Sequence, residues 1–350
     1  DTFGASPLRL KEFNFSKFDP SDLKAIPDQL DMKTCSLESL TLELNIEGCR
    51  IAKRAIKKYR AQPDYDGRPL FVAGSIGPSN YVVSSTEANL NKGTFGQIVE
   101  NFYHQVLGLV EGGADVLLIE TQQDILETKA IIAGANKAFA EKKKKLPMIV
   151  QATVDVFSKM QIFNTDIHAA YTAVSKMGID VFGINCNVGP EEMLATVEKL
   201  SRFCRHPISV VPNAGQPISE DGQTCYKLSP EDMANTMEPF VREYGVSIVG
   251  GCCGTTPAHI KALREKLNGV VPVPRQPDEK VYVSGPQEAV PIDPSKGLLR
   301  IGERLNVRGS KLVRDAVEKE DEEISMHVLE EVVNEQVKDL GIEIIDVCMD

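Results

Sequence analysis

Two adjacent cysteines, Cys252 and Cys253, lie in a glycine-rich run at 250–257. Neighbouring side chains of a strand point to opposite faces, so adjacent thiols can converge only where the strand breaks into a turn, which glycine permits. We expect a strand at 246–249 before this turn. A helix should follow it, with Thr256 as N-cap and Pro257 in the first turn. The thiols therefore lie in a strand-to-helix loop, and a metal is the point on which they would converge.

A third cysteine, Cys186, occupies an equivalent place after an expected strand at 181–185. In a barrel of parallel strands the carboxyl ends all face one mouth. Three thiolates gathered there suit Zn²⁺ and leave a fourth position open for substrate, which favours a catalytic metal. The alternative is that these cysteines are apolar packing residues, an interpretation that suits Cys186 alone better than all three together.

The remaining cysteines lack such a setting. Eight cysteines in 350 residues are too few for a disulfide scaffold, so reduced thiols are expected. We interpret four of them as packing or surface thiols: Cys35, Cys49, Cys204 and Cys225.

Polar residues end two other expected strands. Asn213 follows the strand at 208–211, where its amide oxygen could reach the metal, hold a polar substrate or satisfy the turn backbone. Glu120 ends the strand at 116–121 and would suit a substrate ammonium group, since burying an unpaired acid is costly. The loop at 74–78, with Ser75 and Gly77, permits close backbone approach, although a plain turn also explains it.

The elements that must position these residues alternate between strand and helix. Apolar runs occur at 70–75, 116–121, 148–153, 181–185, 208–211 and 246–249. Between them, Thr94 with Gln97 forms a capping-box pattern, and prolines at 190 and 230 open helices. Strands that are apolar throughout indicate a buried parallel sheet, and the absence of a dinucleotide glycine fingerprint favours a (β/α)8 TIM barrel over a doubly wound sheet. Residues 1–4 resemble the end of a strand, so we expect a barrel that lacks its N-terminal strands.

Composition excludes several classes of protein. A net charge of -11 argues against nucleic-acid binding, which requires a basic face. No apolar stretch approaches the roughly 20 residues of a membrane span, and no secretory leader pattern opens the sequence. We expect a cytoplasmic protein that binds neither nucleic acid nor membrane.

A proline-rich stretch divides the chain. We predict a barrel domain at 1–268, a linker at 269–297 and the start of a second, truncated (β/α)8 barrel at 298–350. In the last segment, strands are expected at 298–301 and 342–347, with a charged helix at 321–340 between them.

Three separated motifs, at 183–186, 212–215 and 250–257, together resemble the homocysteine-binding barrel of the zinc-dependent homocysteine S-methyltransferases. That family includes the cobalamin-dependent methionine synthases, the betaine-dependent enzymes and the S-methylmethionine-dependent enzymes. Residues 301–310 and 345–350 resemble the opening of the pterin-binding (folate) barrel that only the cobalamin-dependent members carry. The resemblance therefore points to a fragment of that branch.

The resemblance implies three sets of site residues. The zinc ligands, which are also the catalytic residues, would be Cys186, Cys252 and Cys253. The homocysteine pocket would be lined by Glu120, Asn213, Ser75 and Gly77. The pterin pocket would begin with Glu303 and Asn306.

The resemblance also implies an activity, which is zinc-dependent methyl transfer to the homocysteine thiol to give methionine. The donor would be methylcobalamin on a cobalamin-binding module outside this chain, and 5-methyltetrahydrofolate would be the ultimate donor. Alternatives are a cobalamin-independent homocysteine S-methyltransferase, a structural zinc protein, or a remnant that has lost activity.

Three departures from the family pattern matter, and the second and third of them motivate the interpretation as an inactive remnant. The first strand with its Asp-Gly loop is absent, the segment 156–161 lacks the usual glycines, and Cys348 replaces an asparagine. We therefore expect an incomplete amino-acid pocket and no full turnover by this chain alone.

Overall fold

The computed structural model describes residues 2–12, 36–84, 93–220, 222–319 and 322–348. Cys35 therefore lies outside the described residues, as does Asp1 of the expected strand end. The chain forms two compact units. Unit 1 comprises Asp1–Glu279 with Val283–Ala289, and unit 2 comprises Lys280–Tyr282 with Val290–Asp350.

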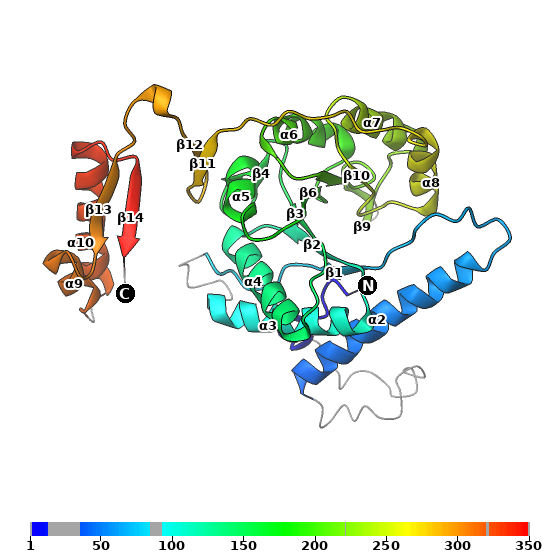
Figure 1. The fold of residues 1–350 in the computed structure, drawn as a ribbon, viewed down its shortest axis with the longest axis horizontal. Helices are drawn as coiled ribbons and strands as arrows, with labels where there is room; N and C mark the ends of the chain where they lie inside the picture. Colours follow the sequence, from blue (N-terminus) through cyan, green and yellow to red (C-terminus); the bar gives the residue numbers. More distant parts are fainter. Residues whose placement is uncertain (1, 13–35, 85–92, 221, 320–321, 349–350) are drawn as a thin grey trace. The chain divides into compact units, whose positions relative to one another are not determined.

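A curled parallel sheet forms the centre of unit 1 (Figure 1). Its strands lie side by side in chain order: β1 (Ala73–Ile76), β2 (Val116–Gln122), β3 (Met148–Ala152), β6 (Val181–Asn185), β7 (Ile208–Val211) and β10 (Ile248–Val249). All pairings are parallel. The six predicted strands and the α/β class are confirmed, as an open six-stranded part of a barrel within the described residues.

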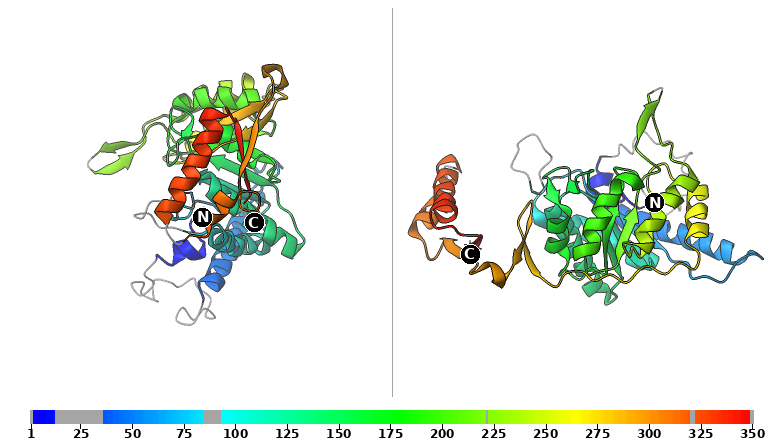
Figure 2. Two further views of the ribbon diagram at one scale, coloured as in Figure 1. Left: turned by 90° about the vertical axis from the view of Figure 1, so that its left-hand side faces the viewer. Right: turned by 90° about the horizontal axis from the view of Figure 1, so that it is seen from above.

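Helices follow these strands and cover the outside of the sheet (Figure 2). They are α3 (Phe95–Gly112), α4 (Ile125–Lys142), α5 (Ile167–Val174), α6 (Pro190–Phe203), α7 (Pro230–Arg242) and α8 (Pro257–Lys266). The predicted caps are confirmed: Thr94 and Gln97 form a capping box, and Thr256 is the N-cap of α8. None of the helices in the described part of the chain is long and apolar enough to cross a membrane.

Two helices precede the first strand, α1 (Pro7–Leu10) and α2 (Leu37–Arg60), and neither was predicted. Helix α2 packs against α3, where Gly108 and Gly112 allow close approach. A Cβ on either glycine would lie within 3 Å of atoms of α2. Glycine at a helix contact thus brings the two backbones together.

The first described residues run beside β1. The hydroxyl of Thr2 donates to the Ser75 carbonyl at 2.8 Å, and the Gly77 N–H donates to the Phe3 carbonyl at 2.9 Å. Residues 2–3 thus follow the end of β1, although they form no regular strand.

Two small hairpins extend the loops of unit 1. One joins β4 (Lys159–Met160) and β5 (Thr165–Asp166) after β3, and the other joins β8 (Ile218–Glu220) and β9 (Gln223–Cys225) after β7. The second hairpin projects from the body in Figure 2. In the first loop, Ser158 adopts φ 65°, in the left-handed region that glycine favours. The segment 156–161 thus makes its turn without a glycine.

The predicted linker is partly ordered against unit 1. The Arg275 guanidinium donates to the His206 carbonyl at 2.6 Å, and the Asp166 N–H donates to the Gln287 carbonyl at 2.8 Å. It also contains two short paired strands, β11 (Val281–Ser284) and β12 (Ala289–Ile292), and a 3-10 turn at Pro294–Lys296.

Unit 2 pairs β13 (Ile301–Asn306) with β14 (Ile344–Cys348) in parallel. Between them lie α9 (Lys311–Val317), α10 (Glu322–Asn334) and a π-helical turn, η4 (Glu335–Asp339). The strand expected at 342–347 is present, whereas the strand expected at 298–301 begins only at Ile301 and runs to Asn306. The helix expected at 321–340 continues past Asn334 as the π-helical turn, and α9 was not predicted. The parallel pair fits the start of an α/β domain, whereas a second barrel stays a prediction.

Candidate metal centre and amino-acid pocket

The three predicted zinc ligands meet at the carboxyl ends of β6 and β10. The Cys186 and Cys253 sulfurs are 3.8 Å apart, and those of Cys252 and Cys253 are 3.9 Å apart. All three sulfurs lie within 4.8 Å of one another. Among the described residues, they are the only cluster of histidine, cysteine or acidic side chains so placed. The two loops thus bring three cysteine sulfurs, which are potential metal ligands, to one point.

These spacings fit a tetrahedral zinc. Bonds of about 2.3 Å at tetrahedral angles place two sulfurs about 3.8 Å apart. The two sulfur pairs measured above match that value. A set of three thiolates would hold Zn²⁺ and leave one position for a further ligand.

The loop after β6 makes its turn with residues other than glycine. Cys186 has φ 62° and Asn187 has φ 68°. The end of β7 and the loop after β3 hold this conformation: the Cys186 N–H donates to the Val211 carbonyl at 3.0 Å, and Asn187 Nδ2 donates to the Val154 carbonyl at 2.9 Å. The left-handed backbone directs the Cys186 thiol toward the vicinal pair.

The loop after β10 uses glycine instead. Gly254 has φ 76° and directly follows the vicinal pair. The Cys252 N–H donates to the Pro212 carbonyl at 2.7 Å, and the Thr255 hydroxyl donates to the Cys252 carbonyl at 2.7 Å. This turn breaks the strand, so both thiols reach the same side.

The thiols perturb one another electrostatically. Hydrogen bonding from Cys252 lowers the pKa of Cys186 to about 5. The same interaction, with burial, raises the pKa of Cys252, and burial with the charge of Cys186 raises that of Cys253. Without metal, the three thiols therefore titrate as a coupled set in which the first thiolate is favoured on Cys186.

Asn213, predicted to approach the metal or hold the turn, lies beside the cluster and is 2% exposed. Its Oδ1 accepts the Cys253 N–H at 3.1 Å, which is the turn-holding role. Its side chain also hydrogen-bonds to Cys186 and contributes to the lowered pKa of that thiol.

Glu120, predicted to bind the substrate ammonium, is half-buried at the same mouth. Ser75 Oγ donates to its Oε1 at 2.6 Å, and Asn185 Nδ2 lies 3.4 Å from its Oε2. Burial is the main cause of its raised pKa, and the charge of Cys186 adds to it. A cation placed beside Glu120 would compensate for this burial.

Gly77, also predicted to line the pocket, is covered by Phe3. A Cβ on Gly77 would lie 2.4 Å from the Phe3 ring, and its N–H is bonded to the Phe3 carbonyl. Its part in amino-acid binding stays a prediction.

Two residues near the thiols were not among the site residues predicted from the sequence. Asn185 is fully buried, and its Nδ2 lies 3.9 Å from the Cys252 sulfur. Tyr226, after β9, packs on Gly254, and its raised pKa reflects partial burial together with the charge of Cys253 and a hydrogen bond to it. The motif at 183–186 contained the signal for Asn185, whereas nothing local marked Tyr226.

The other described cysteines of unit 1 lie apart from the cluster. Cys49 and Cys204 are buried, as predicted for packing residues, and burial raises the pKa of Cys204 to about 12. Cys225 is partly exposed.

In unit 2, Asn306 Nδ2 donates to Glu303 Oε1 at 2.6 Å, and Asn306 Oδ1 accepts two backbone N–H groups of the following turn. Cys348 pairs with Asn306 across the two strands. The pterin-binding role of Glu303 and Asn306 stays a prediction.

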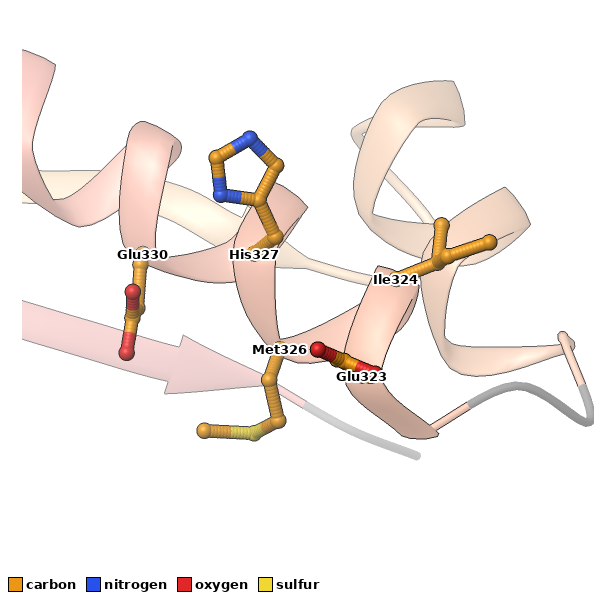
Figure 3. A pocket seen from close by; sticks show the side chains of 5 residues that line it. All are labelled: Glu323, Ile324, Met326, His327 and Glu330. Carbon is orange, nitrogen blue, oxygen red and sulfur yellow. The ribbon is translucent and has the colours of Figure 1, made fainter.

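A hollow on α10 is lined by Glu323, Ile324, Met326, His327 and Glu330 (Figure 3). Its side chains diverge, with Met326 and His327 pointing to opposite sides of the helix. His327 faces Glu331 at 3.5 Å. The arrangement brings no donors together at one point.

Comparison with known proteins gives a family for this fold and site. The family model for homocysteine S-methyltransferase matches residues 3–267. Methionine synthase of Mycobacterium tuberculosis is 35% identical over 308 residues, which are 88% of this chain and 25% of that protein. Methionine synthase of Mycobacterium leprae is 33% identical over 313 residues, again 88% of this chain and 25% of that protein. The chain spans about a quarter of the length of these curated relatives.

Solved structures of the homocysteine methyltransferase MmuM from Escherichia coli share the fold. The oxidized form has a TM-score of 0.52 at 21% identity, covering 76% of this chain and 77% of that chain. The metallated form has a TM-score of 0.50 at 23% identity, and the match covers 67% of this chain and 74% of that chain.

Proposed function

Because the chain belongs to the homocysteine S-methyltransferase family, we propose that unit 1 transfers a methyl group to the sulfur of homocysteine. The observation that carries the proposal is the convergence of Cys186, Cys252 and Cys253 within 4.8 Å, beside the half-buried acid Glu120. Zinc held by the three thiolates would keep the substrate sulfur as a thiolate at neutral pH, where a free thiol with a pKa of about 8.5 is mostly protonated.

The residues of the chain provide the remaining requirements. Glu120 offers a carboxylate to the substrate ammonium, and Ser75 holds that carboxylate in place. Asn213 holds the backbone of Cys253, so the vicinal thiols keep their direction. The substrate thiol loses its proton, its sulfur forms a bond to the methyl carbon, and the donor leaves with the electrons of the broken bond.

We further propose methylcobalamin as donor and 5-methyltetrahydrofolate as its source. Similarity to two methionine synthases over 88% of the chain supports this branch of the family. Unit 2 would then be the opening of a pterin-binding barrel in which Glu303 and Asn306 contact the pterin. The boundaries at 268 and 297 and a cytoplasmic location belong to the same proposal.

Metal content tests the ligand set. The Cys253→Ala variant should lose stoichiometric zinc, whereas Cys204→Ala, which alters a buried cysteine outside the cluster, should retain it. Equal zinc content in the two variants would contradict the proposal. Atomic absorption on the purified proteins gives the stoichiometry.

A structural zinc site is the second candidate, because a set of thiolates could also be closed by a fourth protein group. X-ray absorption at the zinc edge separates the two. A catalytic site should gain one sulfur neighbour when L-homocysteine is added, and a closed structural site should not change. The third alternative is a protein that has lost its activity. An assay of methyl transfer from methylcobalamin to homocysteine by the full-length protein tests this alternative, because an inactive remnant would form no methionine.

A further inference from the structure

Asn185 is the last residue of β6 and directly precedes Cys186. Its side chain contacts the end of β2 and the loop after β10. We propose that Asn185 is a positioning residue that sets the spacing between the Glu120 carboxylate and the thiol cluster, and thereby selects thiols that carry an ammonium group at the spacing found in homocysteine. The inference rests on the proposed function and adds a determinant of specificity to it.

The orientation of the Asn185 amide follows from its partners. Oδ1 accepts the backbone N–H of Thr121 at 2.7 Å, and an N–H can only donate. The amide nitrogen must therefore point the other way, where it donates to Thr121 Oγ1 at 2.9 Å. Asn185 is 0% exposed, so these bonds form without competition from water.

Thr121 is the residue that these two bonds hold. It has φ 61°, an unfavourable conformation for a β-branched residue. The pairing of β2 with β3 also shifts register between Ile119 and Gln122. Such an irregularity redirects a side chain, and here it sets the direction of Glu120. Asn185 therefore stabilises a bend that the chain would not adopt unaided.

The same amide nitrogen faces both halves of the proposed substrate site. It lies 3.4 Å from Glu120 Oε2 and 3.9 Å from the Cys252 sulfur. Ser75 holds the other carboxylate oxygen. One buried amide thus lies within reach of both the carboxylate and a thiol, so their separation depends on contacts to a single group that is itself held by Thr121. A ligand must match that separation to engage both.

The test compares L-homocysteine with 4-mercaptobutanoate, which is the same molecule without the amino group. Dissociation constants for the zinc-loaded chain are measured by isothermal titration calorimetry. A charge-assisted hydrogen bond to the ammonium predicts that the unsubstituted protein binds L-homocysteine at least about 10-fold more tightly. In Asn185→Ala this preference should fall to within about 3-fold, with zinc content unchanged.

Two further variants separate positioning from stability. Asn45→Ala removes another fully buried asparagine, on α2, and should keep the full preference. Thr121→Val removes the hydroxyl that accepts from Asn185 and should give an intermediate preference, which keeps the inference testable if Asn185→Ala does not fold.

The outcomes distinguish this inference from the proposed function. An unchanged preference in both Asn185→Ala and Thr121→Val would overturn the positioning role alone. Equal binding of the two thiols by the unsubstituted protein would overturn the positioning role together with the ammonium-binding role of Glu120, and would leave methyl transfer itself untouched. Failure of the unsubstituted protein to bind L-homocysteine would overturn the proposed function, and this inference with it.

Discussion

The two loops that carry the thiols make their left-handed turns by different means. After β10, Gly254 adopts φ 76°, a conformation that costs glycine little. After β6, Cys186 and Asn187 adopt similar angles despite their side chains. Bonds from neighbouring segments hold both turns, but only the first is also favoured by a glycine of its own. One half of the site is therefore partly encoded in its local sequence, and the other depends on the assembled barrel.

The largest effect is expected from Gly254→Ala. The left-handed backbone disfavours alanine, and its Cβ would lie 2.3 Å from Tyr226 Cγ. We expect a loss of about 3 kcal/mol in the free energy of unfolding and about 10-fold weaker zinc binding. Denaturant unfolding and chelator competition measure the two quantities.

Gly222→Ala is the matched control for that substitution. Gly222 has φ 77°, and a Cβ added there would meet no atom of the described residues within 4 Å. The substitution should cost only about 1 kcal/mol, from the backbone conformation alone, and leave zinc binding unchanged. If the two variants behaved alike, the close packing of Tyr226 on Gly254 would be irrelevant to the thiol turn.

A second prediction concerns thiol reactivity in the zinc-free protein. The pKa of Cys186 is lowered to about 5, so its thiolate persists at neutral pH and is lost only as the pH falls through that value. The pKa values of Cys252 and Cys253 are raised, so these thiols stay protonated. Alkylation by iodoacetamide, followed by mass spectrometry, should be half-maximal near pH 5 at Cys186 and should reach the other two only in alkaline solution.

Zinc-loaded protein provides the control, since bound metal should protect all three thiols. Three cysteines that reacted together near the pH of an ordinary thiol would show that the two loops do not differ in this way.

The smallest effect is expected at Asn187. Asn187→Ala loses the bond to the Val154 carbonyl and keeps the left-handed strain, so we expect about 1.5 kcal/mol of destabilisation. Asn187→Gly loses the same bond but relieves the strain, and should be about 1 kcal/mol more stable than the alanine variant. Thermal unfolding of both proteins measures the difference. Equal stabilities would mean that the β6 loop is not strained.

Structural elements that are determined by residues close together in the sequence were predicted well. Each of the six sheet strands overlaps a short apolar run of the sequence, and the capping box at Thr94 lies within four residues. The convergence of the thiols was predictable because parallel strands place their carboxyl ends at one mouth. Helix α2 was missed although Ser36 caps it, accepting the Ser39 N–H at 3.2 Å.

Features set by distant contacts were not predictable. Nothing near Thr121 or Cys186 indicates a positive φ, because partners in other loops impose it. The role of Asn185 depends on the register shift of β2, which lies 64 residues away at Thr121. Phe3 packs against Gly77 from 74 positions away along the chain, a contact that no local pattern indicates.

The sequence separation of the thiols has a consequence for folding. Cys186 and Cys253 are 67 residues apart, and β7 and α7 lie between them. Bringing both thiols to one metal in the unfolded chain would cost about 4 kcal/mol of loop-closure entropy. The metal site is therefore expected to form only after β6, β7 and β10 are side by side. Metal uptake by refolding protein would thus be a late kinetic event, and its rate would report completion of this half of the barrel.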